Sequence, residues 1–444
     1  MTSETIISPR AQIACVAGDE AAFEALTTAF HQAGFAIARP DAGMSADVGL
    51  IDLRRQAVSP RKAKTIAGAL RRKSPESPLV FVVDPTLDAA VRTALRRFGE
   101  VIPAQDQLGH IVVRCREIIR LRNIAEETGE RLKSLATLNR LVEFPVITTT
   151  STQTRILIAG APGPAAMAAV SAVSAIAGDA TCVLNASQAM RALEHDDFDC
   201  AIFLPTAEND PMLAFVRTLR RHPKHAHLAI IQIADHPADL ATYARKGARD
   251  FVLAEQIAVE LAAKTQLASR RARLLRSMRK FLNSCKGEGI RDASSGAFTS
   301  LFLTEHANRI CARADQTGRA MSLTIASLSD ADGQASTART LNHAARLINR
   351  VTRAEDLVAR ISRKKFIILS PATSVEDAKK IGLRISGVLA NTAFRNQRTD
   401  KPYAIDVITK SYARPRGLCI EECVAAGLKD IDGVSIPPRR RSPR

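Results

Sequence analysis

The chain of 444 residues contains no tryptophan and only three tyrosines. Proteins that bind single-stranded nucleic acid commonly stack bases on aromatic side chains. Two basic runs, residues 269–280 and 437–444, contribute to a formal net charge of +18, which would suit nucleic acid, an anionic membrane surface or acidic protein partners. Because aromatic residues are so few, we interpret the runs as a solvated helix face and a disordered basic tail, and we expect no nucleic-acid partner.

Cysteine pairs of the CxxC type are also absent, and no Cys/His cluster has the spacing of a zinc site. This pattern argues against structural zinc and against a disulfide framework, and it favours a reducing compartment. The eight cysteines are scattered along the chain at positions 15, 115, 182, 200, 285, 311, 419 and 423.

Long hydrophobic runs are missing as well. The longest stretch of small apolar residues, residues 164–178, is shorter than the roughly 18 to 20 residues that a membrane-spanning helix needs. No N-terminal signal is visible. We therefore expect a soluble, cytoplasmic protein without a membrane span.

The sequence does contain short apolar segments that alternate with helix-length segments, and this alternation occurs twice. It is typical of a parallel sheet covered by helices on both faces, and its repetition predicts two flavodoxin-like repeats. A long amphipathic helix follows each repeat, at residues 111–140 and 258–282. The expected strands are residues 11–20, 47–52, 78–83 and 99–104 in the first repeat and 154–160, 179–185, 199–205, 228–234 and 248–254 in the second.

Both repeats resemble response-regulator receiver domains, in which a strand ending in aspartate offers its carboxylate for phosphorylation. One strand of the first repeat ends in Asp52, which the resemblance makes a candidate phosphoacceptor. Phosphoryl transfer also needs an acidic pair to hold Mg²⁺, a hydroxyl residue and a lysine. Only Asp19 and Glu20 approach the acidic pair, and Ala104 occupies the lysine position. Asp52 is therefore either a live phosphoacceptor or a structural residue at a strand end.

The second repeat departs further from the receiver pattern. Leu204 occupies the acceptor position and Ala254 the lysine position. A leucine side chain cannot accept a phosphoryl group, so we expect no phosphorylation in this repeat.

The last third of the chain resembles the GGDEF domain, the fold of diguanylate cyclases. The resemblance implies an α/β domain with a mainly antiparallel central sheet. It rests on Asp292, Gly296, a strand at 321–330, an expected helix at 340–360, a turn at 361–371 and a helix at 373–394.

The signature tetrad of that family is replaced by "SRKK", residues 362–365. A cyclase needs carboxylates on the central strand and in the hairpin to hold two divalent metals, but the strand position here is Ser327. Because ammonium and guanidinium groups repel Mg²⁺, we expect neither cyclase activity nor a metal. The guanine-binding segment after Ser329 is also shortened. Lys364 and Lys365 form either a solvated turn or a contact for an anion or a protein.

An RxxD motif, Arg353 and Asp356, precedes the altered tetrad by five residues. In the family this spacing marks an inhibitory site for cyclic di-GMP, and Arg384 stands where that site has a secondary arginine. A guanidinium can bind phosphate or the O6/N7 edge of guanine, and a carboxylate can accept from guanine N1–H and N2–H. We predict a cyclic di-GMP site on a surface turn, where truncating either motif residue costs under about 1 kcal/mol of stability. The competing interpretation is a surface ion pair.

The order of two receiver-like repeats and a GGDEF-like domain resembles the PleD-related family, and in particular its catalytically inactive cyclic di-GMP effectors. The resemblance implies an adaptor that acts at the cell pole with other adaptors and delivers cell-cycle regulators to the ClpXP protease. We expect a homodimer formed through the receiver-like repeats. The alternative is a phosphorylation-gated scaffold that signals through Asp52.

These interpretations predict three domains, as the chain length also suggests. The predicted division is 9–122 for the first receiver-like domain, 123–152 for a linker helix, 153–268 for the second receiver-like domain, 269–290 for a second linker helix, 291–432 for the GGDEF-like domain and 433–444 for the basic tail.

Overall fold

The computed structural model of the chain forms two compact units. Unit 1 combines Met1–Ala11, Arg122–Phe144 and Met278–Arg444, and unit 2 combines Gln12–Leu121 and Pro145–Ser277. Segments far apart in sequence therefore share a unit. The structure describes residues 11–40, 46–54, 59–73, 77–104, 108–138, 153–205, 211–222, 225, 228–248, 250–285, 289–330, 337–395, 402–403 and 405–432.

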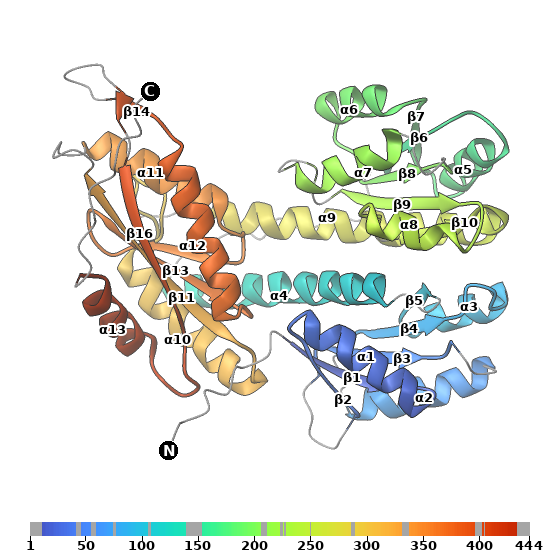
Figure 1. Cartoon of the computed structure of the whole chain (residues 1–444), viewed down its shortest axis with the longest axis horizontal. Coiled ribbons are helices and arrows are strands. Elements are labelled where there is room, and N and C mark those ends of the chain that lie inside the picture. The colour runs from blue at the N-terminus through green and yellow to red at the C-terminus, as the bar shows by residue number, and fades with distance from the viewer. Residues whose placement is uncertain are drawn as a thin grey trace. The chain divides into compact units, whose positions relative to one another are not determined.

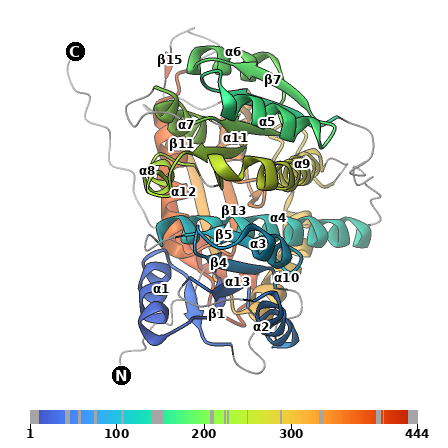
Figure 2. The same cartoon turned by 90° about the vertical axis from the view of Figure 1, so that its right-hand side faces the viewer.

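Unit 2 contains two parallel sheets, and the first has the order β2-β1-β3-β4-β5. Its central strands β3 and β4 are buried along their whole length, as expected where helices cover both faces. Helix α1 lies on one side of this sheet, and α2 and α3 lie on the other (Figure 2). The elements are β1 (Gln12–Val16), α1 (Glu20–Gln32), β2 (Ala36–Ala38), β3 (Val48–Asp52), α2 (Pro60–Lys73), β4 (Leu79–Val83), α3 (Ala89–Arg96) and β5 (Glu100–Pro103).

The second sheet has the order β10-β9-β8-β6-β7, again with every pairing parallel. Numbered within its own repeat, each sheet follows the order 2-1-3-4-5, which is the flavodoxin-like arrangement. The elements are β6 (Arg155–Ala159), α5 (Pro164–Ser174), β7 (Asp179–Val183), α6 (Ala186–His195), β8 (Cys200–Phe203), α7 (Pro211–Arg221), β9 (Ala229–Ala234), α8 (Asp239–Arg245) and β10 (Asp250–Leu253).

Two long helices run from unit 2 into unit 1. Helix α4 (Gly109–Thr137) follows β5, and α9 (Ala262–Ser284) follows a 3-10 turn, η1 (Ala254–Gln256), and a π-helical turn, η2 (Ile257–Leu261). Both agree with the predicted amphipathic helices to within a few residues. Positions 139–152 of the predicted linker and the tail 433–444 lie outside the described residues.

A buried ion cluster joins the two repeats within unit 2. Glu260 on η2 is 2% exposed and binds Arg92 (2.8 Å) and Arg96 (2.7 Å) of α3, with Lys264 at 3.5 Å. Burial by itself would raise the pKa of Glu260, but the three cations outweigh it and hold the pKa below its usual range. The ionised carboxylate therefore stabilises this junction, because each buried charge meets a partner.

The sequence analysis interpreted the basic run 269–280 as a solvated helix face. The structure shows instead that several of its arginines are paired. In α9, Arg271 binds Glu100 of β5 at 2.7 Å. Arg273 and Arg276 both pair with Asp199, the residue before β8. These arginines are engaged by carboxylates of the chain itself, so the run gives little support to a nucleic-acid surface.

Replacing Glu260 with glutamine should lower the free energy of unfolding by about 3 kcal/mol, since it leaves buried cations without their carboxylate. Glu20→Gln is a matched control, because the Glu20–Arg39 pair is exposed and such pairs contribute about 0 to 1 kcal/mol. Because the pKa of Glu260 is lowered, its contribution is lost as pH falls through that pKa. Denaturant unfolding followed by circular dichroism measures both effects, and equal losses for the two variants would contradict this role.

Unit 1 is built on an antiparallel sheet with the order β12-β13-β11-β16. Helices α11 and α12 cover one face (Figure 1), where Leu341, Ile348 and Ile385 pack against Phe366 and Ile368. Helices α10 and α13 contact each other and the sheet. The elements are α10 (Ser300–Thr317), β11 (Met321–Asp330), α11 (Ala338–Val351), β12 (Leu357–Arg360), β13 (Lys365–Pro371), α12 (Val375–Ala390), β14 (Phe394–Arg395), β15 (Pro402–Tyr403), β16 (Ile405–Ala413) and α13 (Ile420–Asp432).

The structure confirms two parallel-sheet α/β repeats followed by a domain with an antiparallel sheet. The helix predicted at 340–360 is wrong beyond Val351, because Leu357–Arg360 forms strand β12. That short apolar run is buried, and such a run does not distinguish a strand from a helix by periodicity. Strand β2 (Ala36–Ala38) was not predicted. Among the described residues, no helix is long and apolar enough to cross a membrane.

Candidate functional site

The predicted RxxD motif forms a tight turn between α11 and β12. Helix α11 ends at Val351, and residues 353–356 follow as the RxxD turn. Asp356 N donates to Arg353 O (3.2 Å), and Arg353 N donates to Asp356 Oδ2 (2.8 Å). This reciprocal pair fixes the turn, because an aspartate side chain can replace a backbone acceptor at a helix end.

The two motif residues differ in burial. Arg353 is exposed, but Asp356 has only 4% of its surface exposed. The prediction that both side chains lie on the surface is therefore wrong for Asp356, because its carboxylate turns inward to the Arg353 amide. Arg384 is exposed on α12. Partial burial and the charge of Arg353 lower the pKa of Arg384, and Asp356 opposes them. The structure thus brings the three predicted residues within range of one another's charge.

The Asp356 carboxyl group has an unusually high pKa. Burial, and next the charge of Glu355, raises its pKa from 3.8 to about 6, against the opposing effects of Arg353 and Ser370. Ser370 is a fully buried residue of β13, close enough to influence this carboxyl. The hydrogen bond from Ser370 that helps to lower this pKa is a poorly formed one, because within the described chain neither Asp356 Oδ1 nor Ser370 Oγ has a partner in ideal geometry. A buried carboxylate with a raised pKa and a poorly formed hydrogen bond is a candidate for binding a ligand's donor groups.

The RxxD turn precedes strand β12 in the chain, and the β12–β13 hairpin turn follows it. Ser327 of β11 lies opposite Lys365 of β13 in the antiparallel register, and Leu328 N donates to Lys364 O (2.8 Å). Lys365 Nζ binds Asp432 at the end of α13 (2.5 Å). The positions that would have to supply metal-binding carboxylates therefore present a hydroxyl and an ammonium, which do not ligate Mg²⁺ as carboxylates do.

Arg360 fixes the backbone of this hairpin. Its guanidinium donates to Ser362 O (3.2 Å), Arg363 O (3.0 Å) and Asp292 Oδ1 (3.2 Å). The Arg360 side chain therefore holds the backbone of the hairpin turn in a fixed conformation. Within the segment that the resemblance assigns to guanine binding, residues 330–343, positions 331–336 lie outside the described residues. Across the described part of the chain, no group of three or more His, Cys, Asp or Glu side chains is placed to hold a metal ion.

The candidate phosphoacceptor Asp52 lies at the end of β3 and is buried. Arg54 binds both of its carboxylate oxygens, with Nε 2.9 Å from Oδ1 and Nη2 2.6 Å from Oδ2. Asp19 accepts from Ala22 N (2.7 Å) as the N-cap of α1. Glu20 pairs with Arg39. The carboxylates that a receiver would use are thus engaged in local structural contacts.

In the second repeat, a side-chain amide bonds the backbone at the acceptor position, which Leu204 occupies. Gln232 of β9 is 1% exposed, and its Nε2 donates to Phe203 O (3.3 Å) and Leu204 O (3.1 Å). The end of β8 is therefore tied to β9 by a neutral side chain. Ala254 begins η1, so neither it nor Leu204 offers phosphoryl chemistry.

Residues 326–410 match the protein family described as "Diguanylate cyclase, GGDEF domain". The chain contains a GGDEF domain. The matched range includes Ser327, the RxxD turn, the hairpin and Arg384, so every residue assigned to the altered catalytic positions and the predicted ligand site lies within it. No curated protein sequence matches the chain.

Solved structures of GGDEF domains are similar to parts of the chain. The GGDEF domain of DgcB from Caulobacter crescentus in complex with c-di-GMP is 18% identical over 33% of this chain and 90% of that one, with a TM-score of 0.30. Diguanylate cyclase SiaD with its activator SiaC, from Pseudomonas aeruginosa, is 22% identical over 40% and 71%, with a TM-score of 0.31. Values of this size carry no argument about function.

The sequence analysis missed two residues of the GGDEF domain's surroundings. Ser370 is the polar residue in the apolar strand "KFIILSP", and that position could have signalled a polar partner nearby. Arg131 on α4 also contacts the RxxD turn, by bonds to Ala354 O and Asp356 O. No local pattern marks Arg131, because it lies 225 residues from Asp356 in the sequence.

Proposed function

We propose that this protein is a catalytically inactive receptor for cyclic di-GMP, which binds at Arg353, Asp356 and Arg384. The observation that carries the proposal is the geometry of the RxxD turn, where the Asp356 carboxylate is fixed to the Arg353 amide and lies within range of the charges of the exposed Arg353 and Arg384. Guanine N1–H and N2–H are donors of the kind that a carboxylate accepts. Two exposed arginines beside it suit the guanine O6/N7 edge and the phosphates.

The altered hairpin supports a receptor rather than a cyclase. Ser327 faces Lys365 across β11 and β13, and Lys364 occupies a position that would carry a carboxylate. Two metals with their nucleotide phosphates would meet positive charge there. We propose that the domain has kept its binding turn while losing its chemistry.

The partners follow from resemblance, and we propose them as such. The chain resembles PopA-like proteins, which are the catalytically inactive cyclic di-GMP effectors of the PleD-related family and act as adaptors. By this resemblance, the ligand-bound protein would recruit other adaptors and client regulators for the ClpXP protease at the cell pole. Self-association would use the receiver-like repeats of unit 2. The faces that meet at Glu260 and at the Glu100–Arg271 pair are occupied within one chain, so a second copy would dock elsewhere on unit 2. Light scattering with and without cyclic di-GMP tests this assembly.

Isothermal titration calorimetry of the full chain with cyclic di-GMP tests the receptor proposal directly. We expect saturable binding, with cyclic di-AMP as a control ligand that lacks the guanine N1–H and O6 groups. Equal affinity for the two dinucleotides, or no heat with either, would contradict the assignment.

Affinity for cyclic di-GMP should fall as pH drops below about 6. The ligand's donors favour the ionised form of Asp356, whose pKa in the free protein is about 6, so binding must displace a proton at lower pH. Linkage then gives a loss of up to about tenfold in affinity per pH unit, and roughly tenfold between pH 7.5 and pH 5. Calorimetry across this range measures the slope, and a flat profile would remove Asp356 from the ligand contact.

A further inference from the structure

Arg131, in the part of α4 that belongs to unit 1, is 1% exposed. Its Nη2 donates to Ala354 O (3.2 Å) and Asp356 O (3.1 Å), both in the RxxD turn. Its Nη1 donates to Leu282 O (3.2 Å) in the last turn of α9. One guanidinium therefore binds the candidate ligand turn and links it to both helices that run from unit 2 into unit 1.

A second set of bonds fixes Arg131 in place. Its Nε donates to Glu127 Oε1 (2.6 Å), which also lies 2.9 Å from His306 Nε2 of α10. His306 Nδ1 is 3.0 Å from Ser134 Oγ, back on α4. Burial opposes ionisation of Glu127, but His306 and Arg131 outweigh it and lower its pKa. The carboxylate is thus held in its charged form, where it balances the buried guanidinium.

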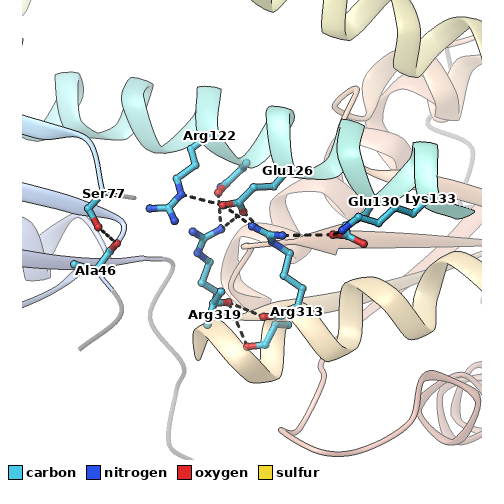
Figure 3. Close-up of polar contacts among 11 residues, drawn as sticks. Ala46, Ser77, Arg122, Glu126, Glu130, Lys133, Arg313 and Arg319 are labelled. Atoms are coloured by element: carbon cyan, nitrogen blue, oxygen red, sulfur yellow. Dashed lines mark hydrogen bonds and ion pairs between the residues drawn. The ribbon is translucent and has the colours of Figure 1, made fainter. Parts of the chain in front are cut away.

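A more exposed belt of ion pairs also attaches α4 to α10 (Figure 3). Arg313 of α10 pairs with Glu126 (2.8 Å) and Glu130 (3.4 Å), and Arg319, two residues after the end of α10, pairs with Glu126 (2.6 Å). These side chains hold the same two helices together as the Arg131 network does. In the described chain, the partners of the Arg313 side chain lie on α4, so this residue offers a comparison that leaves the RxxD turn untouched.

We propose that Arg131 is a positioning residue that couples ligand occupancy of the RxxD turn to α4 and α9. The proposal rests on the function proposed above. Asp356 presents its carboxylate to the ligand and its carbonyl to Arg131. Movement or ordering of the turn on binding therefore changes the hydrogen bonds of the Arg131 guanidinium. A planar guanidinium bonded to three carbonyls and one carboxylate has no freedom to follow one partner alone. A change at the turn therefore changes the packing of both helices, and by reciprocity the helices set the affinity of the turn.

Hydrogen exchange of the full chain, with and without cyclic di-GMP, tests the coupling without any substitution. We expect the ligand to slow exchange in peptides covering residues 353–357 and also in peptides covering 122–137 and 278–284. Protection confined to the turn would overturn the coupling and leave the receptor function standing. Absence of binding and of any protection would overturn both.

Substitutions separate the fork from general packing. Arg131→Gln and Arg131→Lys should weaken cyclic di-GMP binding by about fivefold or more. Lysine keeps the charge beside Glu127, but its three donors on one nitrogen cannot serve Glu127 and all three carbonyls together. Both variants should also abolish the ligand-dependent protection of residues 122–137. Arg313→Gln loosens the same helix pair and should leave the affinity within about twofold of the parent. Affinity and protection unchanged in a folded Arg131→Lys variant would overturn the proposal. Should Arg131→Gln not fold, the lysine variant and the exchange pattern of the parent decide the question.

Discussion

Asp356→Asn should strongly weaken cyclic di-GMP binding and, at the same time, stabilise the protein at pH 7.5. Raising the pKa of Asp356 from 3.8 to about 6 means that the folded state disfavours the ionised carboxylate, by about 2 to 3 kcal/mol above pH 6. Asparagine keeps an acceptor for Arg353 N and adds an amide that can donate to Ser370 Oγ. Losing the charge-assisted contact should lower affinity by roughly ten- to a hundredfold.

The sign of the stability change follows from the direction of the pKa. Asp356 has a higher pKa in the folded state than in the unfolded state. Its favourable contribution to the free energy of unfolding is therefore fully present below the unfolded-state pKa, and it is lost as pH rises through about 6. The advantage of Asp356→Asn should therefore be large at pH 7.5 and shrink toward pH 5. Thermal unfolding at both values measures it, and a destabilised variant at pH 7.5 would show that the carboxylate is needed structurally.

Arg353→Ala is the matched variant for binding. Its side chain is exposed, so the substitution leaves the melting temperature almost unchanged and should still weaken binding at least tenfold. Arg384→Ala should have a smaller effect on affinity. If both arginine variants bind as the parent does, the residues form an ordinary surface charge cluster and the ligand site lies elsewhere.

No cyclic di-GMP should form when the protein is incubated with GTP and Mg²⁺ or Mn²⁺. The antiparallel register sets Ser327 against Lys365, and Lys364 brings a further positive charge to the place where metals would have to bind. Losing metal coordination from both sides of a two-metal site removes the main source of phosphoryl-transfer catalysis. Chromatography of the reaction beside an active cyclase measures the product, and any amount above a protein-free blank would contradict the prediction.

Restoring acids in the hairpin alone should not recover the activity. A Lys364→Glu/Lys365→Glu variant still has Ser327 on β11, and it loses the Lys365–Asp432 ion pair. Product from this double variant would show that Ser327 is not a limiting position. The variant also serves as a binding control, because its substitutions lie outside the RxxD turn.

The strands of the two repeats could be predicted from sequence because buried parallel strands appear as uninterrupted apolar runs between helix-length segments. The same rule failed at Leu357–Arg360, where a buried edge strand follows helix α11 after only the short RxxD turn and its apolar residues extend the helical pattern. Tertiary pairing with β13 decides that segment, and local periodicity does not contain that information.

The residues of the candidate site were predicted, but the burial of Asp356 was not. The resemblance to the GGDEF family, together with the motif spacing, identified Arg353, Asp356 and Arg384, and the fold does bring their charges together. Spacing says nothing about burial, so it placed Asp356 on the surface and missed the raised pKa that distinguishes it. In the same way, Asp52 at a strand end resembles a phosphoacceptor in sequence, while the Arg54 fork that engages both of its oxygens depends on side-chain geometry.

The position of Arg131 in the chain also bears on how the protein is made. Its bond to Asp356 O closes a loop of 225 residues, and the Ser134–His306 contact closes one of 172. At a translation rate of about 5 to 20 residues per second, the ribosome adds the RxxD turn roughly 10 to 45 seconds after Arg131. During that interval the ribosome adds Leu282 and then His306, which bind Arg131 and Glu127 across 151 and 179 residues, so the RxxD turn is the last of these partners to be made. Since late, long-range closures are slow compared with local pairing, we expect this contact to be among the last to form in the newly made protein.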